Sequence, residues 1–563
     1  MAEENTSRKG IPSSEAGRAM LAMLERAGRR ALSYQDRNHH SRTYGCFDRR
    51  YWGWKIVDFP EATYQRNVLL LAGLWGLKES FFYHDLRLVR AVVAGIEYAA
   101  KVQHKDGSFD QAFVHEHSYG ATGFLIHSLA AAGRRLGRNL PEEAVHILRG
   151  VVRKGADFLA RHGEEHGLIS NHLAGAALSL LDSAALVEEP AYLRAADDLL
   201  AKILAGQSPE GWFPEYQGAD PGYQTLCVHY LAQARELLNR EDLSKALDMS
   251  VDFLSCFVHP DGGFGGEYGS RRTSIYYPGG LARLAGKNPQ ASALAELMAE
   301  AIANKSTTTL DDIDLGNLAP LAESYLLAQE SVGDRCMPGE LPWQASGLER
   351  RFPEAGLYVA ATPTLYSVLG VSNGGVLKVF DKARKKLIFD DAGYVGRLKG
   401  GDMITSQVTD LARRAEVSDG SAELEVEFQY WPQPLPGPFR FVILRLLNLT
   451  IMRSIYLGNL VKKLMVKILI TGGKQAGLKL IRLVNFGVDA VEVRDELRLT
   501  GKGTTVLESL SAGQGFVGIH MASAGYFQGT EPPAQEPLLE PDIEELNRTG
   551  RTKLRIRIEA KDA

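Results

Sequence analysis

Two adjacent polar residues, Asn171 and His172, introduce a segment that is otherwise small and apolar. The segment runs from Glu165 to Leu181 and reads EHGLISNHLAGAALSLL, whose alanines and leucines are typical of a helix buried on all sides. Asn is a favoured residue at the start of a helix, so the pair could simply cap this one. The pair could also face a cavity that binds a polar ligand. We favour the cavity, because the chain repeats the same arrangement several times.

Short glycine-containing turns recur through the first half of the chain. They are Asp106–Phe109, Gly167–Ile169, Glu210–Phe213 and Asp261–Phe264. Their spacing of roughly fifty residues is the length of one helical hairpin with its turns. Each turn follows an amphipathic stretch and precedes one rich in Ala, Gly and aromatic residues, which indicates outer helices that shield inner ones. We therefore predict a ring of helical hairpins, an (α/α) toroid.

The character of the sequence changes after Pro338, where alternating β-rich segments replace the helical patterns. We predict a polar tail and leading helix at 1–40, an (α/α) toroid catalytic domain at 41–335, and an antiparallel β-sandwich domain at 336–563. The last domain contains a basic, apolar insert at 432–488, since no Asp or Glu occurs between Glu427 and Asp489. The expected fold class is α+β multidomain.

Composition narrows the function classes. The chain has 563 residues, 45% of them hydrophobic, and a formal net charge of -4, which gives no indication of a nucleic-acid partner. Its four cysteines are scattered without metal-ligand spacing, which favours a reducing compartment. The stretch MAEENTSRKGIPSSE has no apolar core, so we expect no secretory signal and a cytoplasmic protein. No apolar run reaches the roughly 18 residues needed to cross a bilayer.

Polar and aromatic residues collect where the predicted inner helices start. They are His115, His117 and Tyr119 in the first repeat, Asn171 and His172 in the second, Trp212, Glu215, Tyr216 and Tyr223 in the third, and Glu267, Arg271, Arg272 and Tyr276 in the fourth. In a toroid these starts meet at one end of the ring, around a cleft that Trp52, Trp54 and Phe213 would help to line. Aromatic walls stack on sugar rings and arginines pair with carboxylates, so an acidic polysaccharide is the expected ligand.

Three stretches of the chain resemble the heparinase II/III-like polysaccharide lyases and the related alginate lyases. They are SNHLAGAA at 170–177, EGWFPEYQGADPGYQ at 210–224, and GLYVAATPTLYSVLGVSNGGVLKVFD at 356–381. The resemblance implies an (α/α) toroid followed by an antiparallel β domain. It also implies that Asn171 neutralises the uronate carboxylate, that His172 acts as base or aids it, and that Tyr223 serves as acid or base. Tyr216 is a rival for the tyrosine role.

Metal chemistry is not expected from the sequence. The β domain of the resembled family often carries a structural zinc, but here that half has one histidine, His520, and no nearby cysteine. His115 and His117, two residues apart on an expected helix, would diverge, so substrate contact or a structural role is favoured over a metal. We predict no metal and no cofactor.

The chemistry that these residues suit is abstraction of the C5 proton of a uronic acid. Donors aimed at the developing enediolate can contribute several kcal/mol, and a His with a pKa near ~6.5 suits proton abstraction at neutral pH. The simplest outcome is β-elimination by a polysaccharide lyase. A C5-epimerase would use the same site, a non-catalytic glycan-binding or assembly protein could keep the toroid, and a two-carboxylate hydrolase could use Glu215 and Glu267.

The acid-free insert suggests a further partner. Arg445, Arg453, Lys463 and Lys467 fall within about one quadrant of a helix at 100° per residue, with apolar residues between them. A basic amphipathic segment of this kind docks on an anionic membrane surface, which would bring the region 440–482 beside lipid-linked glycans. The alternative interpretation places these residues in strands and a helix of the β domain. The sequence specifies no oligomeric state.

Overall fold

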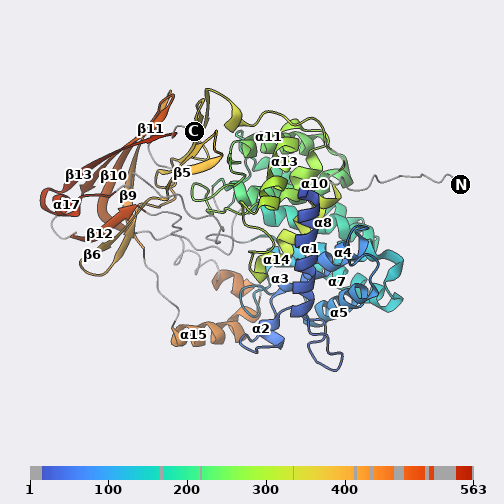
Figure 1. The fold of residues 1–563 in the computed structure, drawn as a ribbon. Helices are drawn as coiled ribbons and strands as arrows, with labels where there is room; N and C mark the ends of the chain where they lie inside the picture. The colour runs from blue at the N-terminus through green and yellow to red at the C-terminus, as the bar shows by residue number, and fades with distance from the viewer. Residues whose placement is uncertain are drawn as a thin grey trace.

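The computed structural model describes residues 15–164, 169–215, 218–331, 333, 335–410, 415–431, 437–454, 456–461, 474–500, 506–512 and 540–560. Its N-terminal part is helical and its C-terminal part consists mainly of strands (Figure 1). Tyr216, Lys463, Lys467 and His520 lie outside the described residues.

The helices form two concentric layers. The inner layer is α4 (Asn67–Gly76), α6 (Tyr119–Leu136), α8 (Ser170–Val187), α10 (Pro221–Leu238), α12 (Pro278–Leu284) and α14 (Leu315–Glu330). The outer layer is α1 (Glu15–Tyr34), α5 (Leu86–Val102), α7 (Glu142–Arg161), α9 (Ala191–Ala205), α11 (Glu241–Ser255) and α13 (Pro289–Asn304). Inner helices are buried along most of their length, whereas outer helices such as α7 bury one face, as the composition of each predicts. The toroid predicted from the sequence is confirmed.

The ring of inner helices is closed. Each inner helix contacts the next along the chain, and α14 contacts α4. Arg66, just before α4, spans the interior: its guanidinium pairs with Glu323 of α14 and donates to the Tyr230 hydroxyl of α10 at 3.0 Å. An ion pair buried this completely persists only with further hydrogen bonds, and Ser128 of α6 donates one to Glu323.

The recurring turn has the same backbone geometry in three repeats. His104 donates its N–H to the Ser108 carbonyl, Ser208 to that of Trp212, and His259 to that of Gly263, at 2.9–3.0 Å. The glycine inside each turn, Gly107, Gly211 or Gly262, has φ between 83° and 95°, a conformation that side chains disfavour. The phenylalanine after it, Phe109, Phe213 or Phe264, is buried. The repeat read from the sequence is thus a structural device that ends an outer helix and leads into an inner one.

The strands form two antiparallel sheets. The first sheet has the order β1 (Leu348–Phe352), β2 (Leu357–Ala361), β3 (Leu365–Gly370), β4 (Val376–Asp381) and β5 (Lys386–Asp391). The second runs β12 (Leu507–Ala512), β6 (Tyr394–Leu398), β7 (Met403–Thr405), β9 (Ser421–Tyr430), β10 (Gln475–Phe486), β11 (Ala490–Leu499) and β13 (Arg551–Glu559), with β8 (Ala415–Ser418) paired to β9.

The first sheet is buried on both faces. Val359 and Val368 belong to the core that it shares with the toroid, while Leu369 and Leu377 pack into the core between the two sheets. This explains why β2, β3 and β4 are buried along their whole length instead of alternating. The sheet is therefore the middle layer that joins the toroid to the rest of the sandwich.

The end of the predicted insert 432–488 belongs to the second sheet. Its last residues form β10, where the fully buried Arg482 pairs with Asp391 and Asp495, so this arginine is not available to a membrane. The described remainder contains α15 (Pro438–Leu449) and the short η3 (Ile451–Arg453). In Figure 1, α15 lies beside α2 (Arg49–Trp52), and Arg445 forms an ion pair with Asp58 at 2.9 Å. Within the described residues, no helix is both long and apolar enough to span a bilayer.

Candidate active site

The starts of neighbouring inner helices meet at one end of the ring. The imidazole of His172 lies close enough to Gly120 of α6 that a β-carbon there would sit 2.7 Å from its Nδ1. Asn171 of α8 contacts Glu215, before α10, and Tyr277, before α12, donates its N–H to Thr225 of α10 at 2.8 Å. The positive ends of these helix dipoles therefore point toward the same region, which favours an anionic ligand.

Glu215 lies buried at this end of the ring and connects several of the predicted site residues. It is fully buried, and its carboxylate accepts the Asn171 backbone N–H at 2.9 Å and the Asn171 side-chain amide at 2.6 Å. Burial raises the pKa of Glu215 to about 8, although the two Asn171 hydrogen bonds and the charge of Arg271 act in the other direction. Asn171 is only 1% exposed, so it holds Glu215 instead of facing an open cleft as the sequence predicted.

His172 is partly accessible to solvent at this end of the ring. Its side chain is 25% exposed, and its Nδ1 lies 2.7 Å from a carboxylate oxygen of Glu164, which is itself buried. Because a carboxylate accepts a hydrogen bond, the neutral ring carries its proton on Nδ1 and presents a lone pair on Nε2. Phe124 packs edge-on against the ring and fixes its plane. Glu164 was missed from the sequence, where only its position eight residues before His172 could have suggested it.

Tyr223 and Arg271 are joined by a second buried carboxylate. Asp220 caps α10 by accepting the Tyr223 N–H at 2.9 Å, and it accepts the Arg271 N–H at 2.8 Å. Both side chains are partly exposed, and the guanidinium of Arg271 lies close enough to Glu215 to affect its pKa. The structure thus brings together five of the predicted site residues: Asn171, His172, Glu215, Tyr223 and Arg271.

Three predicted substrate-binding residues of the fourth repeat lie elsewhere. Glu267 pairs with Lys378 of β4 at 2.8 Å, and Arg272, 1% exposed, donates to the side chain and carbonyl of Gln407. Tyr276 is buried and donates to the Met298 carbonyl at 3.2 Å. The first sheet covers this loop, so the structure does not bring these three residues together with His172, and their role in substrate binding stays a prediction. The sequence could not show that cover.

Two aromatic residues predicted to contact substrate are also buried. Trp212 donates its indole N–H to Glu210 at 2.9 Å, which in turn accepts two backbone N–H groups of the β1–β2 turn. The Tyr119 hydroxyl points toward the Leu159 carbonyl of α7. Both side chains pack into the toroid core instead of lining the site.

His115 and His117 do not lie on a helix. They belong to the loop between the first repeated turn and α6, and both have left-handed backbone, with φ of 60° and 51°. Asp110 accepts both of their backbone N–H groups, at 2.8 and 3.0 Å. The loop turns the two rings toward His104, and one ring nitrogen from each histidine lies within 4.8 Å of the others. These histidines therefore do not diverge as predicted, because they lie in a loop and not on a helix.

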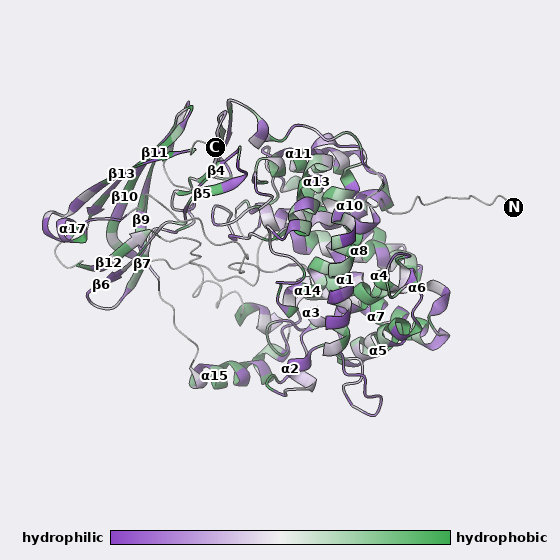
Figure 2. Ribbon diagram, viewed as in Figure 1, coloured by the Kyte–Doolittle hydropathy of each residue, from purple (hydrophilic) through white to green (hydrophobic). Residues whose placement is uncertain are grey.

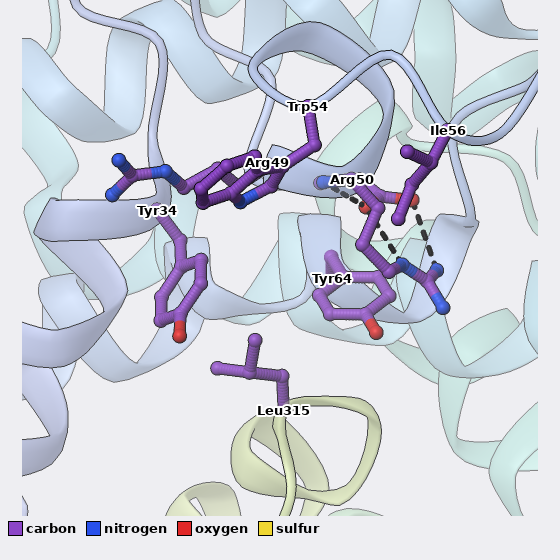
Figure 3. Close-up of a pocket in the computed structure, with 8 residues that line it drawn as sticks. Tyr34, Arg49, Arg50, Trp54, Ile56, Tyr64 and Leu315 are labelled. Carbon is purple, nitrogen blue, oxygen red and sulfur yellow. Dashed lines mark hydrogen bonds and ion pairs between the residues drawn. The ribbon is translucent and has the colours of Figure 1, made fainter.

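A cavity of about 450 Å³ opens near α2 (Figure 3). Tyr34, Trp54 and Tyr64 supply its aromatic lining, with Arg49, Arg50, Ile56 and Leu315 around them. Arg50 is held by Asp48 and Glu61, whereas the Arg49 guanidinium lies over the Trp54 ring. The aromatic and basic segment 42–60 contains two predicted cleft residues, Trp52 and Trp54, and of these Trp54 lines the cavity. Its density of aromatic and basic residues was the available signal for this cavity.

The helical ring followed by an antiparallel sandwich is the fold of polysaccharide lyases. The structure resembles that of Paenibacillus xanthan lyase, with a TM-score of 0.54 and 11% identity over 89% of this chain. It also resembles Streptomyces coelicolor A3 chondroitin AC lyase in complex with chondroitin sulphate, with a TM-score of 0.56, 13% identity, and coverage of 89% of this chain and 68% of that one. The chain spans only 47% of the length of the xanthan lyase.

Within this fold, residues 82–297 match the family described as Ulvan lyase N-terminal domain. The match covers the toroid from the loop before α5 to α13, including His172 and Tyr223. No curated protein matches the chain. The resemblance to heparinase-like polysaccharide lyases and the expected toroid-plus-β fold are confirmed.

Proposed function

We propose that this protein is a polysaccharide lyase that cleaves a uronic-acid-containing polysaccharide by β-elimination. The observation that carries the proposal is the setting of His172. Its ring is partly exposed at the meeting point of the inner-helix starts, and a buried carboxylate orients it. A base held by a second group in this way is a recurring arrangement in proton abstraction. The fold and the match to ulvan lyases support the same class of reaction.

The proposed reaction begins when Nε2 of His172 takes the proton from C5 of the uronate. The electron pair forms the C4–C5 double bond as the C4–O4 bond breaks, and the Tyr223 hydroxyl donates its proton to O4 of the leaving sugar. Arg271 and the N-terminal ends of the inner helices stabilise the negative charge that develops on the substrate carboxylate. Asn171 acts as a positioning residue through Glu215, since it is buried.

The cavity near α2 suits additional sugar units of the chain. Its aromatic rings offer flat apolar faces, and Arg49 beside Trp54 offers a positive charge for a carboxylate or sulfate group. A polysaccharide that is bound along this end of the toroid would contact both the cavity and His172.

The test is to incubate the protein with a panel of acidic polysaccharides in heavy water, including ulvan, xanthan and chondroitin sulphate. Ultraviolet absorbance of an unsaturated uronate at the new chain end supports the lyase. His172→Ala and Tyr223→Phe should each lower turnover by about 10²–10⁴-fold, while the exposed His146→Ala on α7 should leave it unchanged. Deuterium at C5 without unsaturation would replace the lyase with an epimerase, and neither signal with retained glycan binding would replace it with a binding protein.

We also propose that the segment around α15 contacts an anionic membrane surface, where the enzyme would meet lipid-linked glycans. Along α15 the apolar residues Phe439, Val442, Leu446 and Leu449 are 49–76% exposed and lie on one face at 100° per residue. Figure 2 shows that α15 carries both hydrophobic and hydrophilic residues. The absence of acidic residues between Glu427 and Asp489 complements negative lipid headgroups. Arg445 does not take part in this contact, since it pairs with Asp58.

A further inference from the structure

We propose that His104, His115 and His117 form a zinc site in the loop that precedes α6. One nitrogen from each ring lies within 4.8 Å of the others, a spacing that a single bound metal ion can span. Three imidazoles with a remaining open position are a common ligand set for Zn²⁺, which also accepts water or an anion as a fourth ligand. The site is separate from the Glu164–His172 pair and uses residues from the first repeat only.

His117 gives the most direct argument. Its Nδ1 lies 2.8 Å from Asp106 and 2.7 Å from the Ser108 hydroxyl, so the ring orientation is fixed by these two residues. Its Nε2 is buried and has no hydrogen-bond partner among the described residues. A buried ring nitrogen without a partner is unfavourable unless something binds there. A metal ion bound by Nε2, with a carboxylate on Nδ1, satisfies both nitrogens, and this is the usual arrangement around zinc-bound histidines.

His104 repeats this arrangement with a second carboxylate. Its Nε2 lies 2.9 Å from Asp110, which leaves Nδ1 as the ligand atom. The rings of His104 and His117 are 4.4 Å apart, so the two imidazoles lie side by side in the loop. Zinc binds the neutral imidazoles and places a single ion between them.

The backbone of the loop holds the rings in this position. Left-handed conformations are strained at non-glycine residues, and such strain collects at ligand sites. Here it occurs at His115 and His117, and the hydrogen bonds from Asp110 to both backbone N–H groups maintain it. The side chains of all three histidines are partly exposed at the loop surface, which provides an entry path for the ion and an open coordination position.

The experiment measures zinc in the full-length chain, purified without a histidine tag. After dialysis against zinc and then buffer, wild type should retain about one zinc per chain and gain a few degrees in Tm over the EDTA-treated protein. His117→Gln, with folding checked by circular dichroism, should lose both. A matched control replaces His39 and His40, an exposed pair whose rings are 3.9 Å apart, with Gln. This variant should keep the zinc and the Tm shift.

Cobalt substitution gives a second readout that does not depend on a variant. Co²⁺ in a site of three imidazoles has visible absorption bands that aqueous Co²⁺ lacks, and these should appear with wild type and with the His39/His40 variant. Zinc retained by His117→Gln, zinc lost from the His39/His40 variant alone, or wild type without zinc or cobalt bands would each overturn the proposal. Polysaccharide cleavage is not needed for either readout, so failure of the lyase proposal would leave this result intact.

Discussion

The loops that begin with His104 and His259 share a turn but differ in what they do with polar residues. Each begins with a histidine whose N–H bonds to a carbonyl four residues on, and each contains a glycine with positive φ. After the turn, the first loop leaves its histidines partly exposed, whereas the fourth lies under the first β-sheet. Burial lowers the pKa of His259 well below its usual value, and its Nε2 bonds to the Tyr268 hydroxyl at 2.8 Å.

The same difference changes the other polar residues. In the first loop, burial of His104 is outweighed by its hydrogen bond and ion pair with Asp110, which raise the pKa of the ring. In the fourth loop, Glu267 pairs with Lys378 of the first sheet, and Arg272 bonds to Gln407, just after β7 of the second sheet. The two repeats therefore share their backbone geometry. Whether a polar residue is exposed at a candidate site or buried in an interface depends on the element that packs against the loop.

The largest expected effect is on the covered loop. Lys378→Met removes the cation that lies between the buried carboxylates of Glu267 and Asp390, at 2.8 and 2.7 Å. Leaving buried charges uncompensated costs about 3–5 kcal/mol, so we expect a large fall in the urea midpoint of unfolding. Lys386→Met at the exposed start of β5 is the control and should change stability little. Equal stability of the two variants would show that this ion pair does not join the toroid to the sheet.

The shared turn is tested next. Gly107→Ala would force an alanine to φ 95° and bring its β-carbon 2.0 Å from the Lys154 carbonyl, and Gly262→Ala would place one 2.5 Å from the Ala301 side chain. Both should lose about 1–3 kcal/mol of unfolding free energy, measured by thermal denaturation. Gly150→Ala on the exposed side of α7 meets no atom within 4 Å and should stabilise by about 0.5–1 kcal/mol. If Gly107→Ala is as stable as Gly150→Ala, the turn is not required in the first repeat.

The third loop lies between these two cases and gives a pH-dependent prediction. Burial raises the pKa of Glu215 from 4.5 to about 8, and the nearby charge of Asp220 acts in the same direction. The hydrogen bonds from Asn171 and the charge of Arg271 act in the opposite direction. The folded protein then keeps a proton that the unfolded chain releases. This contribution to stability is complete below about pH 4.5 and disappears as the pH rises toward 8. Glu215→Gln should make the dependence of Tm on pH flatter between pH 5 and 8. An unchanged slope would show that Glu215 is ionised in the folded protein.

The sequence was sufficient for the fold because its signals were local. The spacing of apolar residues, the glycines of the turns and the change of pattern after Pro338 each depend only on neighbouring residues. The helices and strands of the structure agree with these local signals. Asn171, His172, Glu215, Tyr223 and Arg271 were found for the same reason, since they stand where inner helices start.

The misplaced residues depend on contacts between distant segments. Glu267 and Arg272 follow the same pattern as Arg271, but Lys378 and Gln407, more than a hundred residues later, take them into an interface. His104 was missed because its ligand partners are brought to it by two left-handed residues, which no periodic pattern encodes. Arg482 is the last residue of the region 440–482 that was predicted to dock on a membrane, although it is buried in the sandwich with Asp391 and Asp495.

The smallest expected effect concerns the segment that lies beside the first loop. Burial lowers the pKa of His115, and the charges of His104, His117 and Arg453 act in the same direction, so Arg453 lies near this loop. If the exposed apolar face of α15 inserts into a membrane, Leu446→Glu should abolish flotation with anionic vesicles, because a charge would replace an exposed leucine that enters the bilayer. Arg445→Gln should float nearly as well as wild type, since that arginine pairs with Asp58 and a surface basic residue adds only ~1 kcal/mol.

Wild type should float at low salt and less at high salt, because the basic residues contribute through screened attraction. Flotation of Leu446→Glu equal to wild type, or no flotation of wild type at any salt, would leave the apolar face of α15 without a membrane role.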